Sequence, residues 1–112
     1  MRIDHITAKP IPDTRGRLTI ETILIAEDSS ATASVPSGKS TGEREAVELD
    51  AVQAVENVNG EIASTLTQHD FNSADALDTF LIELDGTPDK SRLGANALLS
   101  VSIAAQRLFA LW

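Results

Sequence analysis

The hydrophobic period of this chain changes at Pro36, and no other feature constrains the fold as strongly. Before Pro36, apolar and polar residues alternate over residues 2–9 and 17–26, and residues 31–35 form a third short run. Alternation is the period of a β-strand. Only short polar turns separate the three runs, whereas parallel strands need a long crossover connection. The first third of the chain therefore predicts a three-stranded antiparallel meander.

Local signals place the ends of these strands. Pro10 and Pro12 are expected to end the first strand. Asp13-Thr14-Arg15-Gly16 predicts a turn in which Gly16 can take a positive φ. The second strand, residues 17–26, carries apolar side chains on both faces and is expected to be the most buried. The polar residues 27–30 predict the second reversal.

After Pro36 the apolar residues recur every three or four positions, which is the period of an α-helix. This spacing predicts a helix over residues 43–66, with glutamates in its first half, where a helix N-terminus favours negative charge. Asn72 or Ser73 can cap a second helix, which ends at Asp85-Gly86-Thr87-Pro88. Strands followed by helices, without alternation, indicate an α+β fold.

A third helix is predicted from about Gly94 to Trp112, and it is apolar nearly all round. Three short strands and two helices can cover one side of it. We therefore expect the isolated chain to cover the other side by self-association through helix 94–112. A chain of 112 residues is expected to form one domain, residues 1–112.

The composition excludes several classes of function. The chain has 9 Lys and Arg against 17 Asp and Glu, a net charge of −8, so we expect no nucleic-acid binding. It has no cysteine, which excludes disulfides, thiol catalysis and thiolate metal sites. No apolar run approaches 18 residues, so we expect no membrane partner. Because polar residues follow Met1 directly, we expect no signal peptide and a cytoplasmic location.

Residues 36–42 contain most of the candidate chemistry, with two glycines, three hydroxyl side chains and one lysine. Such a loop can wrap an anion or a metal-bound phosphate. Residues 33–40 nearly reproduce a phosphate-loop pattern, with Ala33 in place of the first glycine and Asp85 as a possible magnesium ligand. The predicted antiparallel sheet argues against that class, because phosphate-loop nucleotidases need a larger parallel sheet. A polar loop that only caps the next helix is the simpler alternative.

Four segments of the chain, taken in order, form a recognisable pattern. The first is Asp13-Thr14-Arg15-Gly16 with Thr19-Ile20-Glu21, and the second is Val35-Pro36-Ser37-Gly38-Lys39-Ser40-Thr41-Gly42-Glu43-Arg44-Glu45-Ala46-Val47-Glu48-Leu49. The third is Ala54-Val55-Glu56-Asn57-Val58-Asn59. The fourth is Leu81-Ile82-Glu83-Leu84-Asp85-Gly86-Thr87-Pro88 with Lys90-Ser91 and Leu93-Gly94-Ala95-Asn96-Ala97. Together they span nearly the whole chain, and they resemble the N-terminal domain of enolase (phosphopyruvate hydratase).

The resemblance implies a part in glycolysis, in a lyase that dehydrates 2-phosphoglycerate to phosphoenolpyruvate with two magnesium ions. In that family a barrel domain supplies the proton-abstracting lysine, its acidic partner and the ligands of the first metal, so no catalytic residue is expected in this chain and the chain alone is expected to be inactive. The implied substrate loop comprises Ser37, Gly38, Lys39, Ser40, Thr41 and Gly42.

The resemblance also implies individual roles. Ser40 matches the position that reaches the second magnesium ion through its oxygens, which suits the preference of magnesium for hard oxygen ligands. Gly38 and Gly42 match hinges of a loop that closes over the substrate. Arg15 and Glu21 match positions of the subunit interface, although an exposed carboxylate explains Glu21 equally well.

The sequence departs from the enolase pattern in three places. Lys39 stands where enolases commonly have a small residue, and it could pair with a substrate phosphate, obstruct closure or point into solvent. Arg17-Leu18 replaces the usual Asn-Pro of the first turn. After Asp50 the chain lacks roughly ten residues that enolases usually have in a surface loop. These departures predict a divergent enolase or an enolase-like relative.

Three hypotheses follow. The first is an enolase capping domain that needs a barrel domain in cis or in trans. The second is a stand-alone enolase-like module with a binding or assembly role. The third is a small phosphate- or nucleotide-binding protein that uses residues 38–41.

Overall fold

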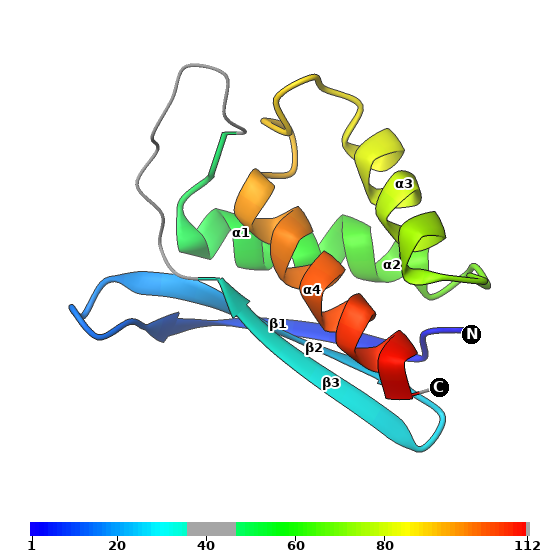
Figure 1. The fold of residues 1–112 in the computed structure, drawn as a ribbon. Helices are drawn as coiled ribbons and strands as arrows, with labels where there is room; N and C mark the ends of the chain where they lie inside the picture. Colours follow the sequence, from blue (N-terminus) through cyan, green and yellow to red (C-terminus); the bar gives the residue numbers. More distant parts are fainter. Residues whose placement is uncertain (36–46, 112) are drawn as a thin grey trace.

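The computed structural model describes residues 1–35 and 47–111, and these form one antiparallel sheet covered by helices on one face (Figure 1). The strands are β1 (His5–Pro12), β2 (Leu18–Ala26) and β3 (Ser29–Val35), and they lie in the order β1-β2-β3. The helices are α1 (Ala51–Asn57), α2 (Ala63–Leu66), α3 (Ala74–Asp85) and α4 (Ala95–Leu111), with a π-helical turn, η1 (Val58–Ile62), between α1 and α2. The predicted α+β fold, a meander followed by helices, is confirmed.

The two prolines lie inside β1, so the prediction that they end this strand was wrong. Pro10 is paired with Ile20 and Pro12 with Leu18 on β2. The N–H of Ala8 points to the free edge of the sheet, where it donates to the Asn59 side chain at 2.7 Å. Because directions alternate along a strand, the nitrogens of Pro10 and Pro12 face the same free edge, and the missing N–H groups cost no bond to β2.

The turns between the strands are tight. In the first, Gly16 has a φ of 81°, as predicted. In the second, Ala26 and Ser29 are paired, so only Glu27 and Asp28 make the reversal, and Glu27 takes a positive φ of 55°. Residues 29 and 30, expected in the turn, belong to β3.

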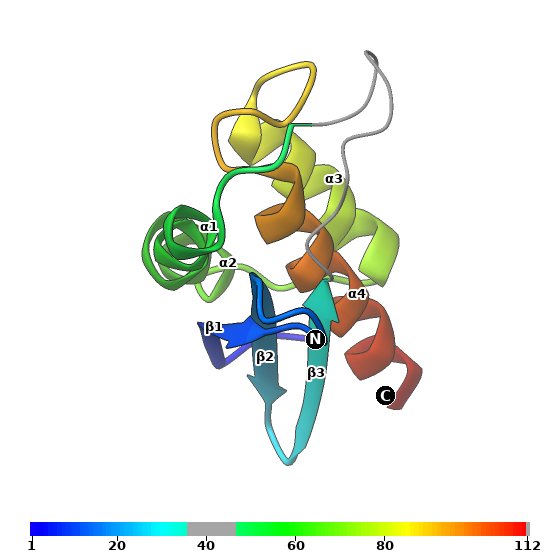
Figure 2. The ribbon, with the colours of Figure 1, turned by 90° about the vertical axis from the view of Figure 1, so that its left-hand side faces the viewer.

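Only one face of the sheet is covered, which corrects the expectation that β2 is buried on both faces. Ile20, Thr22 and Leu24 of β2 are fully buried beneath the helices, where α4 packs on β2 and β3. On the opposite face Ile25 is 37% exposed. Figure 2 shows the helices gathered on one side of the sheet. A buried hydroxyl pair links the layers, because Thr22 Oγ1 lies 2.7 Å from Ser100 Oγ of α4.

The first helix begins at Ala51, so the prediction of a helix over residues 43–66 was wrong at its start. The Asp50 side chain caps it by accepting from the N–H groups of Val52 (2.9 Å) and Gln53 (3.2 Å). The first turn contains no acidic residue, so the expected charge effect of the glutamates is replaced by this cap. Residues 43–46 lie outside the described residues.

The second and third helices agree closely with the sequence. Ser73 caps α3 by accepting from the N–H of Ala76 at 3.1 Å, and Gly86 ends it with a φ of 75°. α4 runs from Ala95 to Leu111, and Val101, Ala104 and Leu108 are fully buried. Among the described residues, none of the helices has the length and apolarity needed to cross a membrane.

Candidate functional site

The predicted substrate loop, which comprises Ser37, Gly38, Lys39, Ser40, Thr41 and Gly42, lies outside the described residues, and so does the predicted metal ligand Ser40. The structure does describe the two ends to which residues 36–46 are attached. One is Val35, the buried last residue of β3, which is paired with Ile20. The other is residues 47–50, which lead into α1 and end at its cap, Asp50.

Residues 47–50 are held by the turn after α3 and by the start of α4. The N–H of Val47 donates to the carbonyl of Asp89 at 2.8 Å, and the N–H of Ala95 donates to the carbonyl of Val47 at 2.8 Å. Two positions later, the Asn96 side chain accepts from the N–H of Leu49 at 3.2 Å and donates to its carbonyl at 2.8 Å. Both polar groups of Val47 and of Leu49 therefore point to the 89–96 region.

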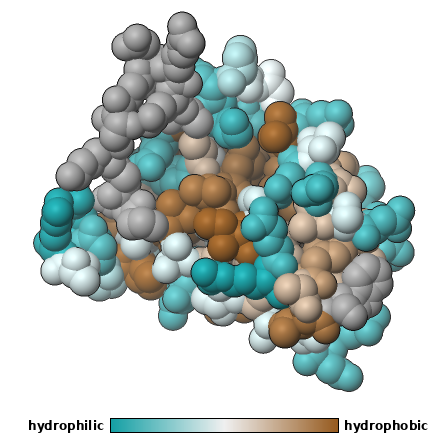
Figure 3. Space-filling view, viewed as in Figure 1, coloured by the Kyte–Doolittle hydropathy of each residue, from teal (hydrophilic) through white to brown (hydrophobic). Residues whose placement is uncertain are grey.

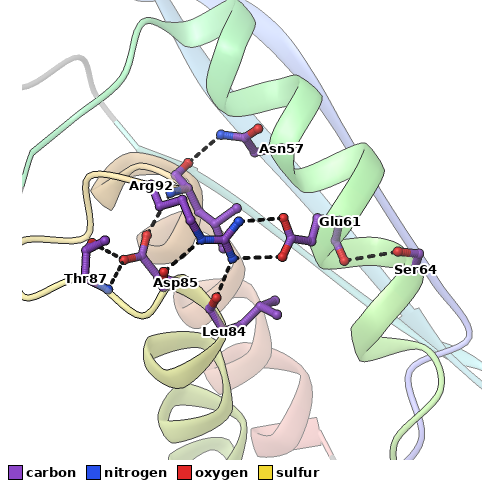
Figure 4. A network of polar contacts seen from close by, with 8 residues as sticks. Asn57, Glu61, Ser64, Leu84, Asp85, Thr87 and Arg92 are labelled. Atoms are coloured by element: carbon purple, nitrogen blue, oxygen red, sulfur yellow. Dashed lines mark hydrogen bonds and ion pairs between the residues drawn. The ribbon is translucent and has the colours of Figure 1, made fainter.

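A polar network holds that turn in place (Figure 4). Asp85, which is only 2% exposed, accepts from the N–H of Thr87 at 2.9 Å and from the N–H of Leu93 at 2.7 Å. Arg92 donates through Nε to the carbonyl of Asp85 at 2.9 Å and makes a two-pronged ion pair with Glu61, at 2.9 and 2.8 Å. Glu61 thus joins η1 to the turn.

The network also sets the ionisation of its carboxyl groups. Burial raises the pKa of Asp85, but the hydrogen bonds from Thr87 and Leu93 and the charge of Arg92 outweigh it and hold the pKa below the usual range. The hydrogen bonds from the Arg92 guanidinium lower the pKa of Glu61. Both carboxyl groups are therefore ionised at neutral pH, and both are occupied by partners within the chain.

These contacts bear on the phosphate-loop alternative. The Asp85 carboxylate is the acceptor for three donors of its own turn, because the Thr87 hydroxyl also donates to it. β3, which precedes residues 36–46, lies at the edge of an antiparallel sheet. Neither feature matches a nucleotide-binding phosphate loop, which agrees with the sequence argument against that class.

The two candidates for the subunit interface lie at different places on the β1–β2 hairpin. Arg15 lies at the tip of the β1–β2 turn, where its N–H donates to Asp13 at 2.8 Å. Glu21 lies on the uncovered face, opposite Lys9, with 3.6 Å between Nζ and the carboxylate. The structure therefore places both residues on accessible surface, but it brings Glu21 together with Lys9 and not with Arg15.

Two of the three places where the resemblance predicts a departure from the enolase pattern lie close together in space. A hollow of about 440 Å³ lies between the start of β2 and the segment that leads into α1. Arg17 and Leu18 form one wall, and residues 48–52 form the other. Leu18 and Val52 are each 50% exposed at this hollow. The predicted changes at Arg17-Leu18 and after Asp50 therefore border one hollow, whereas Lys39 lies outside the described residues.

Apolar surface remains on α4 and α3. Figure 3 shows apolar atoms in the middle of the face that α4 crosses, and Leu99 and Leu111 of α4 are 48% and 65% exposed. Leu108 of the same helix is fully buried and adds nothing to this surface. A cavity of about 240 Å³ between α3 and α4 is lined mostly by apolar side chains, including Ile82 and Leu99.

The described residues contain no group of three or more His, Asp or Glu side chains that could hold a metal ion. His5 is exposed on β1, and the ring of His69 packs on Phe80 with 4.7 Å between ring centroids.

Sequence reasoning missed Asn96 and the Arg92–Glu61 pair. In the sequence, Asn96 stands out only as part of the enolase-like segment Leu93-Gly94-Ala95-Asn96-Ala97. A polar residue in the first turn of an otherwise apolar helix is the one local signal that could have indicated a buried contact. Arg92 and Glu61 are 31 positions apart, and no local pattern links them.

Comparisons with known proteins show which family this sequence matches. A family model described as "Enolase, N-terminal domain" matches residues 3–111. Enolase 1 of Lactococcus lactis subsp. cremoris (strain SK11) is 50% identical over 117 aligned residues, and enolase 1 of Chlorobaculum tepidum is 47% identical over 119. These alignments cover 94% and 96% of this chain but only 28% of each relative. They are longer than the chain itself, so both relatives have residues in this region without a counterpart here.

Proposed function

Since this chain belongs to the enolase N-terminal domain family, we propose that it is the capping domain of an enolase or of a divergent enolase-like protein, and that it acts with a barrel domain in cis or in trans. The observation that carries the proposal is the family match, which extends over residues 3–111. The reaction assigned to the assembled protein is the dehydration of 2-phosphoglycerate to phosphoenolpyruvate.

The role of this chain in the assembled enzyme would be to close the active site. Residues 37–42 would form the substrate loop, and its closure would exclude water from the reacting centre. Ser40 would offer its hydroxyl and carbonyl oxygens to the second magnesium ion, whose charge stabilises the enolate in this class of reaction. Supporting this assignment, both ends of the segment are anchored, at Val35 in the sheet and at Val47 on the 89–96 region.

A hybrid enzyme tests the proposal. The chain replaces the matching N-terminal part of the L. lactis enolase, and a control enzyme is rejoined at the same junction with its own N-terminal part. We expect the hybrid to form phosphoenolpyruvate, and the 112-residue chain alone to form none at any magnesium concentration. Ser40→Ala should raise the magnesium concentration needed for half-maximal rate. Activity of the purified chain alone, or an inactive but folded hybrid beside an active control, contradicts the proposal.

Self-association of the chain is distinct from its assembly with a barrel domain. We propose that the chain also associates with itself through the apolar surface of helix 94–112, supported by the exposure of Leu99 and Leu111. Light scattering at micromolar concentration should then show more than one chain per particle, and Leu111→Ser should shift the mass toward the monomer. The matched control is Ile25→Ser on the uncovered sheet face, which should leave the mass unchanged. A monomeric parent chain rules self-association out.

A further inference from the structure

Hydrogen bonds to backbone groups connect residues 47–50 to the turn after α3 and to the start of α4. Four hydrogen bonds join Val47 and Leu49 to Asp89, Ala95 and Asn96. One of them satisfies the N–H of Ala95, the first residue of α4, which has no partner within its own helix. The helix start and the segment that follows residues 36–46 therefore complete each other's hydrogen bonds.

The side chains of Leu49 and Asn96 pack closely against Gly94. Gly94 has a φ of 100°, and a Cβ atom there would lie 3.0 Å from Leu49 Cγ and 3.0 Å from Asn96 Oδ1. Asn96 itself is only 8% exposed. A glycine is thus needed for the backbone of residue 94 to lie against Leu49, and the Asn96 amide is held away from water.

A second asparagine makes the same kind of contact elsewhere in the molecule. Asn59 of η1 accepts from the N–H of Ala8 at 2.7 Å and donates to its carbonyl at 2.9 Å. It thereby occupies the free edge of β1 as a neighbouring strand would. Asn59 is exposed, whereas Asn96 is buried, and only Asn96 lies on the connection to residues 36–46. The two side chains form a natural pair for comparison.

We propose that Asn96 is a positioning residue for the site assigned above: by binding both backbone polar groups of Leu49, it sets where the chain joins the helical layer after the proposed substrate loop. This inference rests on the proposed function, because the site it serves is that of the assembled enzyme. Asn96 is proposed to contact neither the substrate nor the metal. Its effect passes through Leu49 and Val47.

We choose the variants from the two hydrogen bonds that the Asn96 side chain makes with Leu49. Asn96→Leu removes both hydrogen bonds at similar volume and leaves the N–H and carbonyl of Leu49 without these partners in a partly buried place. Asn96→Asp keeps an acceptor for the N–H but sets a carboxylate against the carbonyl of Leu49, at the position where Nδ2 now lies 2.8 Å away. Asn59→Leu is the matched control at the edge of β1.

The hybrid enzyme and the 112-residue chain are measured together. In the chain, Asn96→Asp should speed amide exchange at Val47 and Leu49 at least about tenfold relative to core amides of β2, whereas Asn59→Leu should not. In the folded hybrid, both Asn96 variants should lower kcat about 10- to 100-fold and raise the magnesium concentration for half-maximal rate, because small misplacements of a site cost that much. Asn59→Leu should leave both values unchanged.

The outcomes separate this inference from the proposed function. An inactive folded hybrid with native Asn96 overturns the proposed function and this inference with it. An active hybrid whose Asn96→Asp variant keeps the parent kcat and magnesium requirement overturns this inference alone. The inference also fails if Asn59→Leu lowers kcat as strongly as Asn96→Asp, because the loss would then reflect stability. If Asn96→Leu does not fold, Asn96→Asp carries the test.

Discussion

Two turns of this molecule are built around an aspartate and a glycine with positive φ, and they differ mainly in burial. In the β1–β2 turn, Asp13 accepts from the N–H groups of Arg15 (2.8 Å) and Arg17 (2.9 Å), and Gly16 has a φ of 81°. In the turn after α3, Asp85 accepts from Thr87 and Leu93. The first turn faces water and closes a hairpin, whereas the second joins three helical elements.

The comparison shows that the same local chemistry can shape a turn or lock a tertiary contact. Asp13 binds only residues within four positions of itself. Asp85 reaches Leu93, eight positions away, and the adjacent Arg92 extends the network to Glu61 on η1. Loss of the first carboxylate should therefore act locally, and loss of the second should loosen the packing of the turn against η1.

The largest expected effect is that of Asp85→Ala. It leaves the N–H groups of Thr87 and Leu93 without their acceptor in a buried place, which should lower the free energy of unfolding by about 2–4 kcal/mol. Urea unfolding of the 112-residue chain measures it. Glu83→Ala on the exposed side of α3 is the control, expected to stay within about 0.5 kcal/mol of the parent chain. Equal effects of the two substitutions would show that the network adds nothing to stability.

Arg92→Ala comes next, because it removes the ion pair with Glu61 and the donor to the carbonyl of Asp85 while leaving the Asp85 carboxylate satisfied. We expect a smaller loss of stability than for Asp85→Ala. Arg92→Lys should recover only part of it, since a lysine cannot make the two-pronged contact. The same urea series measures both. A complete recovery by lysine would mean that charge alone matters at this position.

Acid should distinguish the two turns. Burial raises the pKa of Asp13, but hydrogen bonds from Arg17 and Arg15 and the nearby guanidinium charges outweigh it and lower the pKa, as hydrogen bonds and Arg92 do for Asp85. A lowered pKa contributes stability above the unfolded value, about 3.9, and that contribution is lost as the pH falls through the folded value. Asp85 is 2% exposed and the Asp13 side chain 17%. We therefore expect the dependence of the unfolding temperature on pH between pH 5 and 2 to become flatter with Asp85→Asn than with Asp13→Asn, because the more buried carboxylate depends more on its partners.

The smallest expected effect is that of Asp13→Ala. Water can replace the carboxylate at this turn, and Gly16 and the pairing of Pro12 with Leu18 still close the hairpin. We expect a change in stability well below that of Asp85→Ala, and unchanged amide protection in α3 and α4. Loss of helix protection on this substitution would contradict the local role assigned to the β1–β2 turn.

The sequence by itself determined the order of strands and helices, the positive φ of Gly16 and the end of α3 at Gly86, and it narrowed the cap of α3 to Asn72 or Ser73, of which the structure has Ser73. Each of these depends on groups only a few positions apart. A period of two or of about 3.6 shows which face a residue takes, and a cap is satisfied within one turn of its own helix. The substrate-loop residues could be named from the family resemblance, and they remain a prediction.

Only the tertiary structure decided where the first helix begins and what holds the chain before it. The spacing of residues 43–50 allows a helix, yet the N–H and carbonyl groups of Val47 and Leu49 bond to Asp89, Ala95 and Asn96 instead. The hollow that brings Arg17 and Leu18 beside residues 48–52 was equally invisible in the sequence. The physical reason is the same in both cases: backbone groups take the partners that folding brings to them, and those partners lie tens of residues away.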